Sequence, residues 1–349
     1  MRAVPGFQGL RTHVVREPVS RRSYTVVVIE AGSGVMGYGE CAGASEADVD
    51  QARRILADRD VTAYEVIDRQ LEAVPALRAA VNMALLDIAG KVAKAPVYQL
   101  LGGPTRNRAR AMTRIEGSSD DELAASLRRA KGAGYRAFLV PAPEHPGQQQ
   151  EFVNRTLRCV DALIAAGGDD CDFVLDAAGG LTPAIAAALS RALEGRHLLW
   201  FDEPVAVSNL SVAGRLSAES VTPLGFGRDI HDASSFQDLL REGVIDVLRP
   251  DIRRHGISGV RRLATLAETY YTAMAPHHDG GPVATAAALH LAACVPNFFI
   301  QQIPFPESEE DRQVRAAVTG RPVEVIEDGF AVLPDGPGLG VEVNERVLA

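Results

Sequence analysis

The pattern of apolar and polar positions divides the chain into an irregular first part and a regular remainder. Residues 23–30 (SYTVVVIE) are rich in β-branched side chains and precede a glycine-rich turn, so we expect antiparallel strands over residues 22–40. The pattern becomes helical over residues 47–99, most clearly at 76–93, where apolar side chains recur every three or four positions. We therefore predict a small α+β domain over residues 1–108.

Beyond this domain, short apolar runs alternate with helical stretches. The runs predicted as strands cover 109–115, 137–140, 173–175, 198–201, 224–226, 244–248, 272–275 and 298–300. The predicted helices include 120–131, 148–166, 183–193, 233–242, 259–270 and 283–293. Eight strands that alternate with helices favour a parallel α/β barrel, predicted over 109–305. The alternative is a doubly wound sheet, but no Gly-x-Gly-x-x-Gly motif follows the first strand. Residues 306–349 are turn-rich and are predicted to pack back on the first domain.

Composition narrows the class of protein. Hydrophobic residues make up 46% and charged residues 23% of the 349 residues, and the net charge is −9 without a basic tract, which argues against nucleic-acid binding. No apolar stretch is long enough to span a membrane and the first residues lack a signal core, so we expect a cytoplasmic protein. The four cysteines lack metal-ligand spacing and are expected to be free thiols.

Polar side chains follow six of the predicted strands at almost constant spacing. The intervals between them are 26, 26, 23, 26 and 25 residues, close to one strand–helix unit each. Because the carboxyl ends of barrel strands meet at one rim, we expect these side chains to line it. For any single acid, the alternative is the cap of the following helix. The six residues are Asp176, Asp202, Arg228, Asp251, His277 and Gln302.

The residue types at these positions indicate two kinds of chemistry. Asp176 and Asp202 follow neighbouring strands and offer the carboxylate oxygens that Mg²⁺ prefers. Asp251 and His277 also follow neighbouring strands, and an aspartate that holds an imidazole in one tautomer makes it a general base. A metal beside such a pair suits removal of the proton next to a carboxylate, because the metal stabilises the enolate.

Several segments carry motifs that together point to one family. They are ALLDIAGK at 84–91, PVYQLLGGP at 96–104, VLD at 174–176, WFDEP at 200–204, APH at 275–277 and GPGLG at 336–340. Over nearly its whole length the chain resembles the enolase superfamily, in the branch that includes mandelate racemase, muconate lactonizing enzyme and acid-sugar dehydratases. The resemblance implies a modified TIM barrel, (β/α)7β, closed by an α+β capping domain, with Mg²⁺ and a carboxylate substrate.

The resemblance also implies roles for particular residues. Asp176 and Asp202 match two metal ligands, and Asp251 with His277 matches the dyad of the acid-sugar dehydratase branch. Members that use a lysine on the sixth strand do not match, because the last of the three lysines is Lys131. The second strand ends Phe-Leu-Val-Pro where racemases of this branch carry lysines, which disfavours a two-base racemase.

The strongest departure from the family pattern is Arg228, which stands where the third metal ligand, an acid, is expected. A fixed cation there repels a divalent ion, so Mg²⁺ is a doubtful cofactor. One hypothesis is that Arg228 pairs with Asp176 or Asp202 and partly replaces the metal. The other is that it grips a substrate carboxylate while Asp229 or Glu203 completes the metal shell. Asp202 replaces a more usual glutamate, and Ala178 and Gln302 replace an expected amide and acid.

These observations lead to a sugar-acid dehydratase that removes the proton α to a carboxylate. His277 is the predicted base, Asp251 orients it, and a small sugar acid is the expected partner. The candidate substrate-binding residues are Arg228, Arg249, His278 and Gln302, and the candidate metal ligands are Asp176, Asp202, Glu203 and Asp229. Two alternatives remain open: a family member that has lost metal binding and now binds a small acid or a partner protein in a regulatory role, or an epimerase or cycloisomerase. The resemblance further implies a homo-oligomer.

Overall fold

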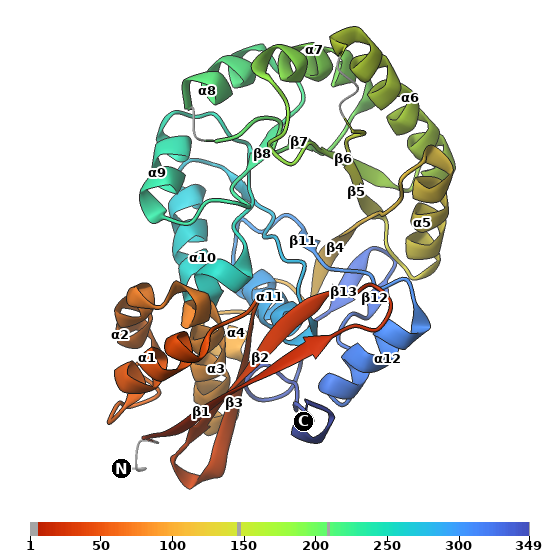
Figure 1. Ribbon diagram of the computed structural model, residues 1–349. Coiled ribbons are helices and arrows are strands. Elements are labelled where there is room, and N and C mark those ends of the chain that lie inside the picture. The colour runs from red at the N-terminus through yellow and green to blue at the C-terminus, as the bar shows by residue number, and fades with distance from the viewer. Residues whose placement is uncertain (1–5, 145–147, 208–209, 349) are drawn as a thin grey trace.

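The computed structural model describes residues 6–144, 148–207 and 210–348, which form an α+β cap beside a barrel (Figure 1). In the cap, β2 pairs antiparallel with both β1 and β3. The cap elements are β1 (Phe7–Arg16), β2 (Ser23–Ala31), η1 (Gly32–Gly34), β3 (Val35–Cys41), α1 (Glu46–Leu56), α2 (Tyr64–Gln70), η2 (Leu71–Ala73), α3 (Pro75–Ala93) and α4 (Val97–Leu100). Strand β1 was missed by the sequence analysis, because its exposed and half-buried positions show no clean alternation.

The barrel confirms the predicted α/β fold. Its parallel strands are β4 (Arg108–Arg114), β5 (Ala137–Pro141), β6 (Asp172–Asp176), β7 (Trp200–Asp202), β8 (Leu224–Phe226), β9 (Val247–Leu248), β10 (Ala273–Met274) and β11 (Gln301–Gln302). Consecutive strands pair from β4 to β10; β11 pairs with β4, and a bridge from Met274 to Phe298 completes the closure. The last strand therefore begins slightly later than residues 298–300, where it was predicted.

Helices surround the barrel, and one follows each of the strands β4 to β10 (Figure 1). They are α5 (Asp120–Gly132), α6 (Gln149–Gly167), α7 (Pro183–Leu193), η3 (Glu194–Arg196), α8 (Leu210–Glu219), α9 (Ala233–Arg241), α10 (Ile252–Glu268) and α11 (Pro282–Cys294). Helix α10 starts seven residues earlier than predicted, because the Asp251 side chain accepts from the Arg253 N–H and caps it. Gly256, at φ 64°, then kinks the helix.

Three apolar clusters hold these layers together. One fills the barrel interior, a second lies between the strands and the outer helices, and a third forms the core of the cap. The interior cluster consists of Met112, Ala137, Leu139, Val174, Trp200, Val247, Ala275 and Ile300. All four cysteines are free, as expected. Across the described ranges, no helix combines the length and apolar character that crossing a bilayer requires.

The end of the chain returns to both parts. Its elements are α12 (Glu309–Val318), β12 (Ile326–Glu327), β13 (Phe330–Val332) and α13 (Glu345–Leu348), and β13 pairs antiparallel with β4. The buried Asp87 carboxylate accepts from the N–H groups of Leu339 and Tyr38 at 2.8 and 3.0 Å and pairs with Lys91 at 2.7 Å. One side chain of α3 therefore ties the returning segment to the cap sheet.

The cap also contacts the barrel through a polar pair between α3 and α10. The Asn82 side chain donates to the Ser258 hydroxyl at 2.9 Å and accepts from the Ser258 N–H at 3.0 Å. Both residues are buried, so leaving either unpaired would cost about 1–3 kcal/mol. This contact sets the position of the cap on helix α10.

The close approach of the returning segment to Asp87 predicts a strong effect of Gly338→Ala. Gly338 has φ +69°, and a Cβ there would lie 2.0 Å from Asp87 Oδ1. We expect a destabilisation of about 2 kcal/mol or more, from backbone strain and loss of the Asp87 hydrogen bonds. Gly132→Ala, at a helix end where a Cβ meets nothing within 4 Å, is the control. Equal thermal midpoints for the two variants would contradict this account.

Candidate active site

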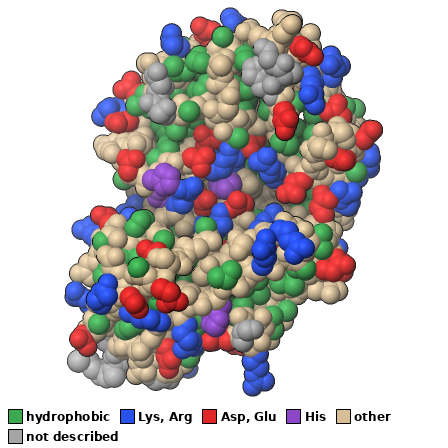
Figure 2. Space-filling model, in the orientation of Figure 1, with side chains coloured by type: hydrophobic (Ala, Val, Ile, Leu, Met, Phe, Trp, Pro, Cys, Tyr) green, Lys and Arg blue, Asp and Glu red, His purple; other side chains and the backbone are tan. Residues whose placement is uncertain are grey.

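The carboxyl ends of the barrel strands bring the six spaced polar residues to one rim. Asp176 ends β6, Asp202 ends β7 and Gln302 ends β11. The other three, Arg228, Asp251 and His277, follow the ends of β8, β9 and β10 by two or three residues. Figure 2 shows charged and histidine side chains gathered along the boundary between barrel and cap. All six are at least nine-tenths buried.

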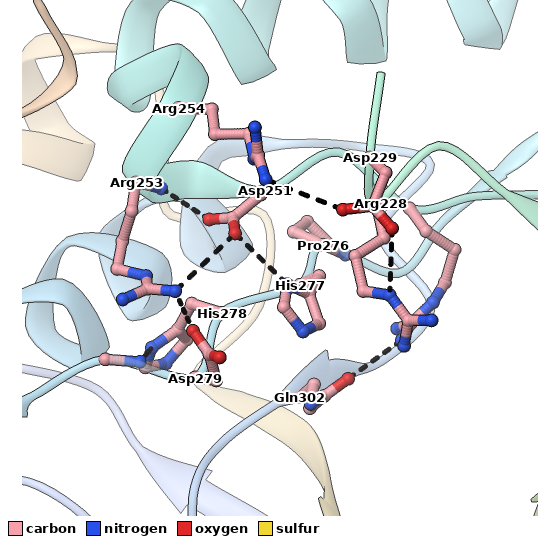
Figure 3. A network of polar contacts seen from close by, with 12 residues as sticks. Arg228, Asp229, Asp251, Arg253, Arg254, Pro276, His277, His278, Asp279 and Gln302 are labelled. Carbon is pink, nitrogen blue, oxygen red and sulfur yellow. Dashed lines mark hydrogen bonds and ion pairs between the residues drawn. The ribbon is translucent and has the colours of Figure 1, made fainter. Parts of the chain in front are cut away.

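Asp251 and His277 form a hydrogen-bonded pair at this rim. His277 Nδ1 lies 3.2 Å from Asp251 Oδ2, and the two residues are also bridged through their backbones (Figure 3). The second carboxylate oxygen, Oδ1, accepts from the Arg253 N–H at 2.7 Å. Asp251 therefore has two roles. It caps the following helix, which was the alternative considered for a single acid, and it orients His277.

The electrostatics of this pair keep the two groups in complementary states. Burial raises the pKa of Asp251, but the hydrogen bond from His277 and the charges of His277 and Arg253 outweigh it and hold the pKa below its usual range. Burial lowers the pKa of His277, and Asp251 offsets this only in part. The aspartate therefore does not make His277 more basic than usual, but the imidazole is neutral near pH 7 and can accept a proton.

A cluster of arginines surrounds the two rim aspartates. Arg228 donates to both oxygens of Asp176, from Nη1 at 2.9 Å and Nη2 at 3.1 Å. Arg114, at the end of β4, donates to Asp176 Oδ2 at 2.9 Å. Burial raises the pKa of Asp176, but the bond and charge of Arg228 and the charge of Arg114 lower it overall. Asp176 is therefore an ionised carboxylate held by two guanidinium groups.

Asp202 has its own buried arginine. Arg249 is 0% exposed, and its Nε forms an ion pair with Asp202 Oδ1 at 2.9 Å. The same oxygen accepts a hydrogen bond from Trp200 Nε1 at 2.7 Å. Arg249 packs against the Trp200 ring and donates to Gln302 Oε1 at 2.8 Å. Asp202 Oδ2 has no hydrogen-bond partner and lies 3.9 Å from Arg228 Nη1. Arg228 thus approaches both aspartates, while Arg249 lies beneath the rim.

Glu203 and Asp229, the other two candidate metal ligands, lie in different surroundings. Glu203 is buried, and its Oε1 accepts from the N–H groups of Gly227 and Arg228, both at 2.8 Å. Burial and the charge of Asp202 raise the pKa of Glu203 to about 7. The Asp229 side chain is 66% exposed and lies 3.5 Å from Arg254, away from the aspartates. Neither carboxylate joins Asp176 and Asp202 around a common point.

The rim residues do not fit a Mg²⁺ site. Among the described residues, no group of three or more histidine, cysteine or acidic side chains is arranged to hold a metal ion. Asp176 is saturated by Arg228 and Arg114, and the Arg228 guanidinium lies between the two carboxylates that would have to share the ion. Mg²⁺ needs near-octahedral oxygen ligation, which one partnerless Asp202 oxygen cannot supply.

A small cavity of about 260 Å³ opens beside His277 and Gln302. Its charged lining comes from both parts of the molecule: Arg22 of the cap, and Arg114, Glu116 and Asp279 of the barrel. Arg114 stands at the exit of the first barrel strand. It was not predicted as a site residue, although its place at a strand exit is the same signal that identified Asp176.

His278 does not line this cavity. It is fully buried, accepts from the Gly280 N–H at 3.3 Å and lies 3.4 Å from the Thr285 hydroxyl. Its neighbour Asp279 pairs with Arg253 (Figure 3). These contacts support the loop after β10, so His278 helps to hold His277 in place.

Models of two protein families match this chain. Residues 8–102 match the mandelate racemase / muconate lactonizing enzyme N-terminal domain, and residues 122–347 match the enolase C-terminal domain-like family. Together the two matches cover both the cap and the barrel.

Relatives and solved structures agree with the family matches. The D-galactonate dehydratase of Ralstonia nicotianae is 30% identical over 77% of this chain and 72% of its own length. The D-galactarolactone cycloisomerase of Agrobacterium fabrum is 30% identical over 94% of this chain and 91% of its own. The crystal structure of an enolase from Agrobacterium radiobacter, with bound Na and L-malate, superposes with a TM-score of 0.88 at 27% identity, covering 98% of this chain and 94% of that one.

The burial of Arg249 predicts that Arg249→Met strongly destabilises the protein. The substitution leaves the fully buried Asp202 carboxylate without its nearest cation, so we expect a loss of about 3–5 kcal/mol in the free energy of unfolding. Arg241→Met, which removes an exposed pair with Asp238, should cost less than about 1 kcal/mol. Denaturant titration of both variants measures this difference, and similar losses would contradict it.

Proposed function

This chain belongs to the mandelate racemase / muconate lactonizing enzyme family of the enolase superfamily, and on that premise we propose that it is a sugar-acid dehydratase. His277 is proposed as the base that removes the proton α to the substrate carboxylate, and Asp251 as the residue that orients it. The observation that carries the proposal is the His277–Asp251 hydrogen bond beside a cavity lined by arginines from the cap and the barrel.

The surroundings of His277 suit this role. The ring lies between Asp251 on one side and Arg228 and Gln302 on the other (Figure 3). Its buried, neutral imidazole is ready to accept a proton, and Asp251 stabilises the imidazolium that results. The guanidinium groups near the cavity favour an anionic substrate.

The proposed reaction removes water from a hydroxy acid with hydroxyl groups on the α and β carbons. His277 takes the α proton, and the electron pair of that C–H bond forms the enolate of the carboxylate. The β C–O bond then breaks as His277 returns its proton to the leaving hydroxyl, giving water and an enol that becomes a 2-keto acid. One residue performs both transfers when the proton and hydroxyl leave from the same face.

A cycloisomerase is the second candidate. The relative from Agrobacterium fabrum that bears this name matches 94% of the chain at 30% identity. Both reactions begin with removal of an α proton, so the same dyad serves either. Incubation with aldonic acids, aldaric acids and their lactones separates them by mass: a dehydratase product is lighter by one water, and an isomerase product has the mass of its substrate.

Replacing either member of the dyad tests the role of His277. We expect His277→Asn and Asp251→Asn to lower kcat by about 10²–10⁴-fold, the usual contribution of a positioned acid–base group. Exchange of the α proton with deuterium, followed by NMR, should fall in parallel.

The matched control is His231→Asn, which changes an exposed histidine beside Arg254 and should leave turnover unchanged. Full α-proton exchange by a folded His277→Asn protein would refute the proposed base. An absence of exchange by the wild-type protein across the acid library would instead support the alternative of a small-acid binding protein.

The lowered pKa of His277 predicts the pH dependence of turnover. A base works only when deprotonated, and burial lowers the pKa of this imidazole, so its active form persists to lower pH than for an ordinary histidine. We expect kcat/KM to be level above pH about 7 and to decline only below about 6.5, the usual imidazole value. A decline that begins at alkaline pH, with the protein still folded by circular dichroism, would contradict this prediction.

A further inference from the structure

The rim carries its positive charge on arginine side chains. Three acids, Asp176, Asp202 and Glu203, face three arginines, which are Arg114, Arg228 and Arg249. Burial raises the pKa values of Asp202 and Glu203, that of Glu203 to about 7, so near neutral pH the three acids do not exceed the three arginines in charge. A divalent cation entering it would meet three guanidinium groups and find Asp176 already paired.

Arg228 is the member of this cluster that lies between the two aspartates. Its Nη1 is 2.9 Å from Asp176 and 3.9 Å from Asp202, so one guanidinium bridges the carboxylates of neighbouring strands. Its bonds to Asp176 use two of the five N–H groups that a guanidinium offers. The closest approach of Asp229 to its Nε is 4.0 Å, longer than a hydrogen bond.

We propose that the Arg228 guanidinium takes the place of the divalent metal, so that this site binds the substrate carboxylate and stabilises its enolate without a metal ion. The inference rests on the proposed function, because it assigns the group that faces the charge created when His277 removes the α proton. Asp176 holds the guanidinium through two of its N–H groups, which leaves others for the substrate oxygens.

The charge balance of the reaction is consistent with this role. When the α C–H bond breaks, its proton moves to His277 and its electron pair adds a second negative charge to the substrate carboxylate. Arg228 faces His277 from the side opposite Asp251, so the new anion forms beside a fixed cation (Figure 3). A fixed cation near a developing charge stabilises it without reorganisation during the reaction.

Calorimetry on the purified full-length protein tests the inference directly. We expect no heat of Mg²⁺ or Mn²⁺ binding below about 1 mM, whereas the hard-cation sites of proteins commonly bind more tightly. L-Malate, a small hydroxy acid, should bind equally well with and without EDTA. Tight binding of either metal by the wild-type protein, or turnover that EDTA abolishes and Mg²⁺ restores, would overturn the proposal.

Two substitutions sharpen the test. Arg228→Ala should weaken L-malate binding about tenfold or more, because a charge-assisted hydrogen bond contributes about 1.5–3 kcal/mol. Arg228→Glu places a third acid beside Asp176 and Asp202 and should create Mg²⁺ binding that the wild-type protein lacks. Arg254→Glu, which changes an arginine beside Asp229 outside the cluster, should alter neither property.

The outcomes separate this inference from the proposed function. Metal binding is read by heat and does not require turnover, so it can fail while His277 still exchanges α protons. A folded Arg228→Glu protein that binds no more Mg²⁺ than the wild type would show that Arg228 is not what excludes the metal, and would overturn the inference. Thermal midpoints establish that each variant is folded.

Discussion

The rim of this barrel depends on the pairing of buried carboxylates with arginines. Asp176 and Asp202 lie at the ends of adjacent strands with almost no exposure, and an ionised carboxylate in that setting is very costly without a partner. Arg228 and Arg249, from the next two strand units, supply the opposite charge. The barrel therefore closes around a network of opposite charges, in which the loss of one member weakens the compensation of its buried partners.

The same network explains how the barrel accommodates polar groups above an apolar interior. Trp200 belongs to the interior cluster, yet its indole N–H bonds Asp202 and its ring packs against Arg249. The guanidinium of Arg249 reaches on to Gln302 at the end of the last strand. Trp200 thus contacts both the apolar interior and the charged rim, so the packing of the barrel interior is linked to the charges of its rim.

Much of the fold could be predicted from the sequence, but the pairing of the rim residues could not. Asp176, Asp202 and Arg228 could be placed at one rim from the alternation of strands and helices and from their 26-residue spacing. Both signals can be read from the sequence because they depend on local periodicity. Whether Arg228 would bind Asp176, Asp202 or a ligand depended on side-chain directions between different strands, which spacing does not contain. Strand β1 and helix α12 were missed because their polar faces hide the apolar period.

Helix α10 has a mechanical consequence for the proposed proton transfer. Its first turn is capped by Asp251, the residue that bonds His277, and a few residues later Ser258 is tied to Asn82 of the cap. The segment of α10 between these two contacts is short and includes the kink at Gly256. Helix α10 therefore carries both the contact that places the cap and the residue that orients the imidazole, so the position of the cap and the aim of the proposed base share one support.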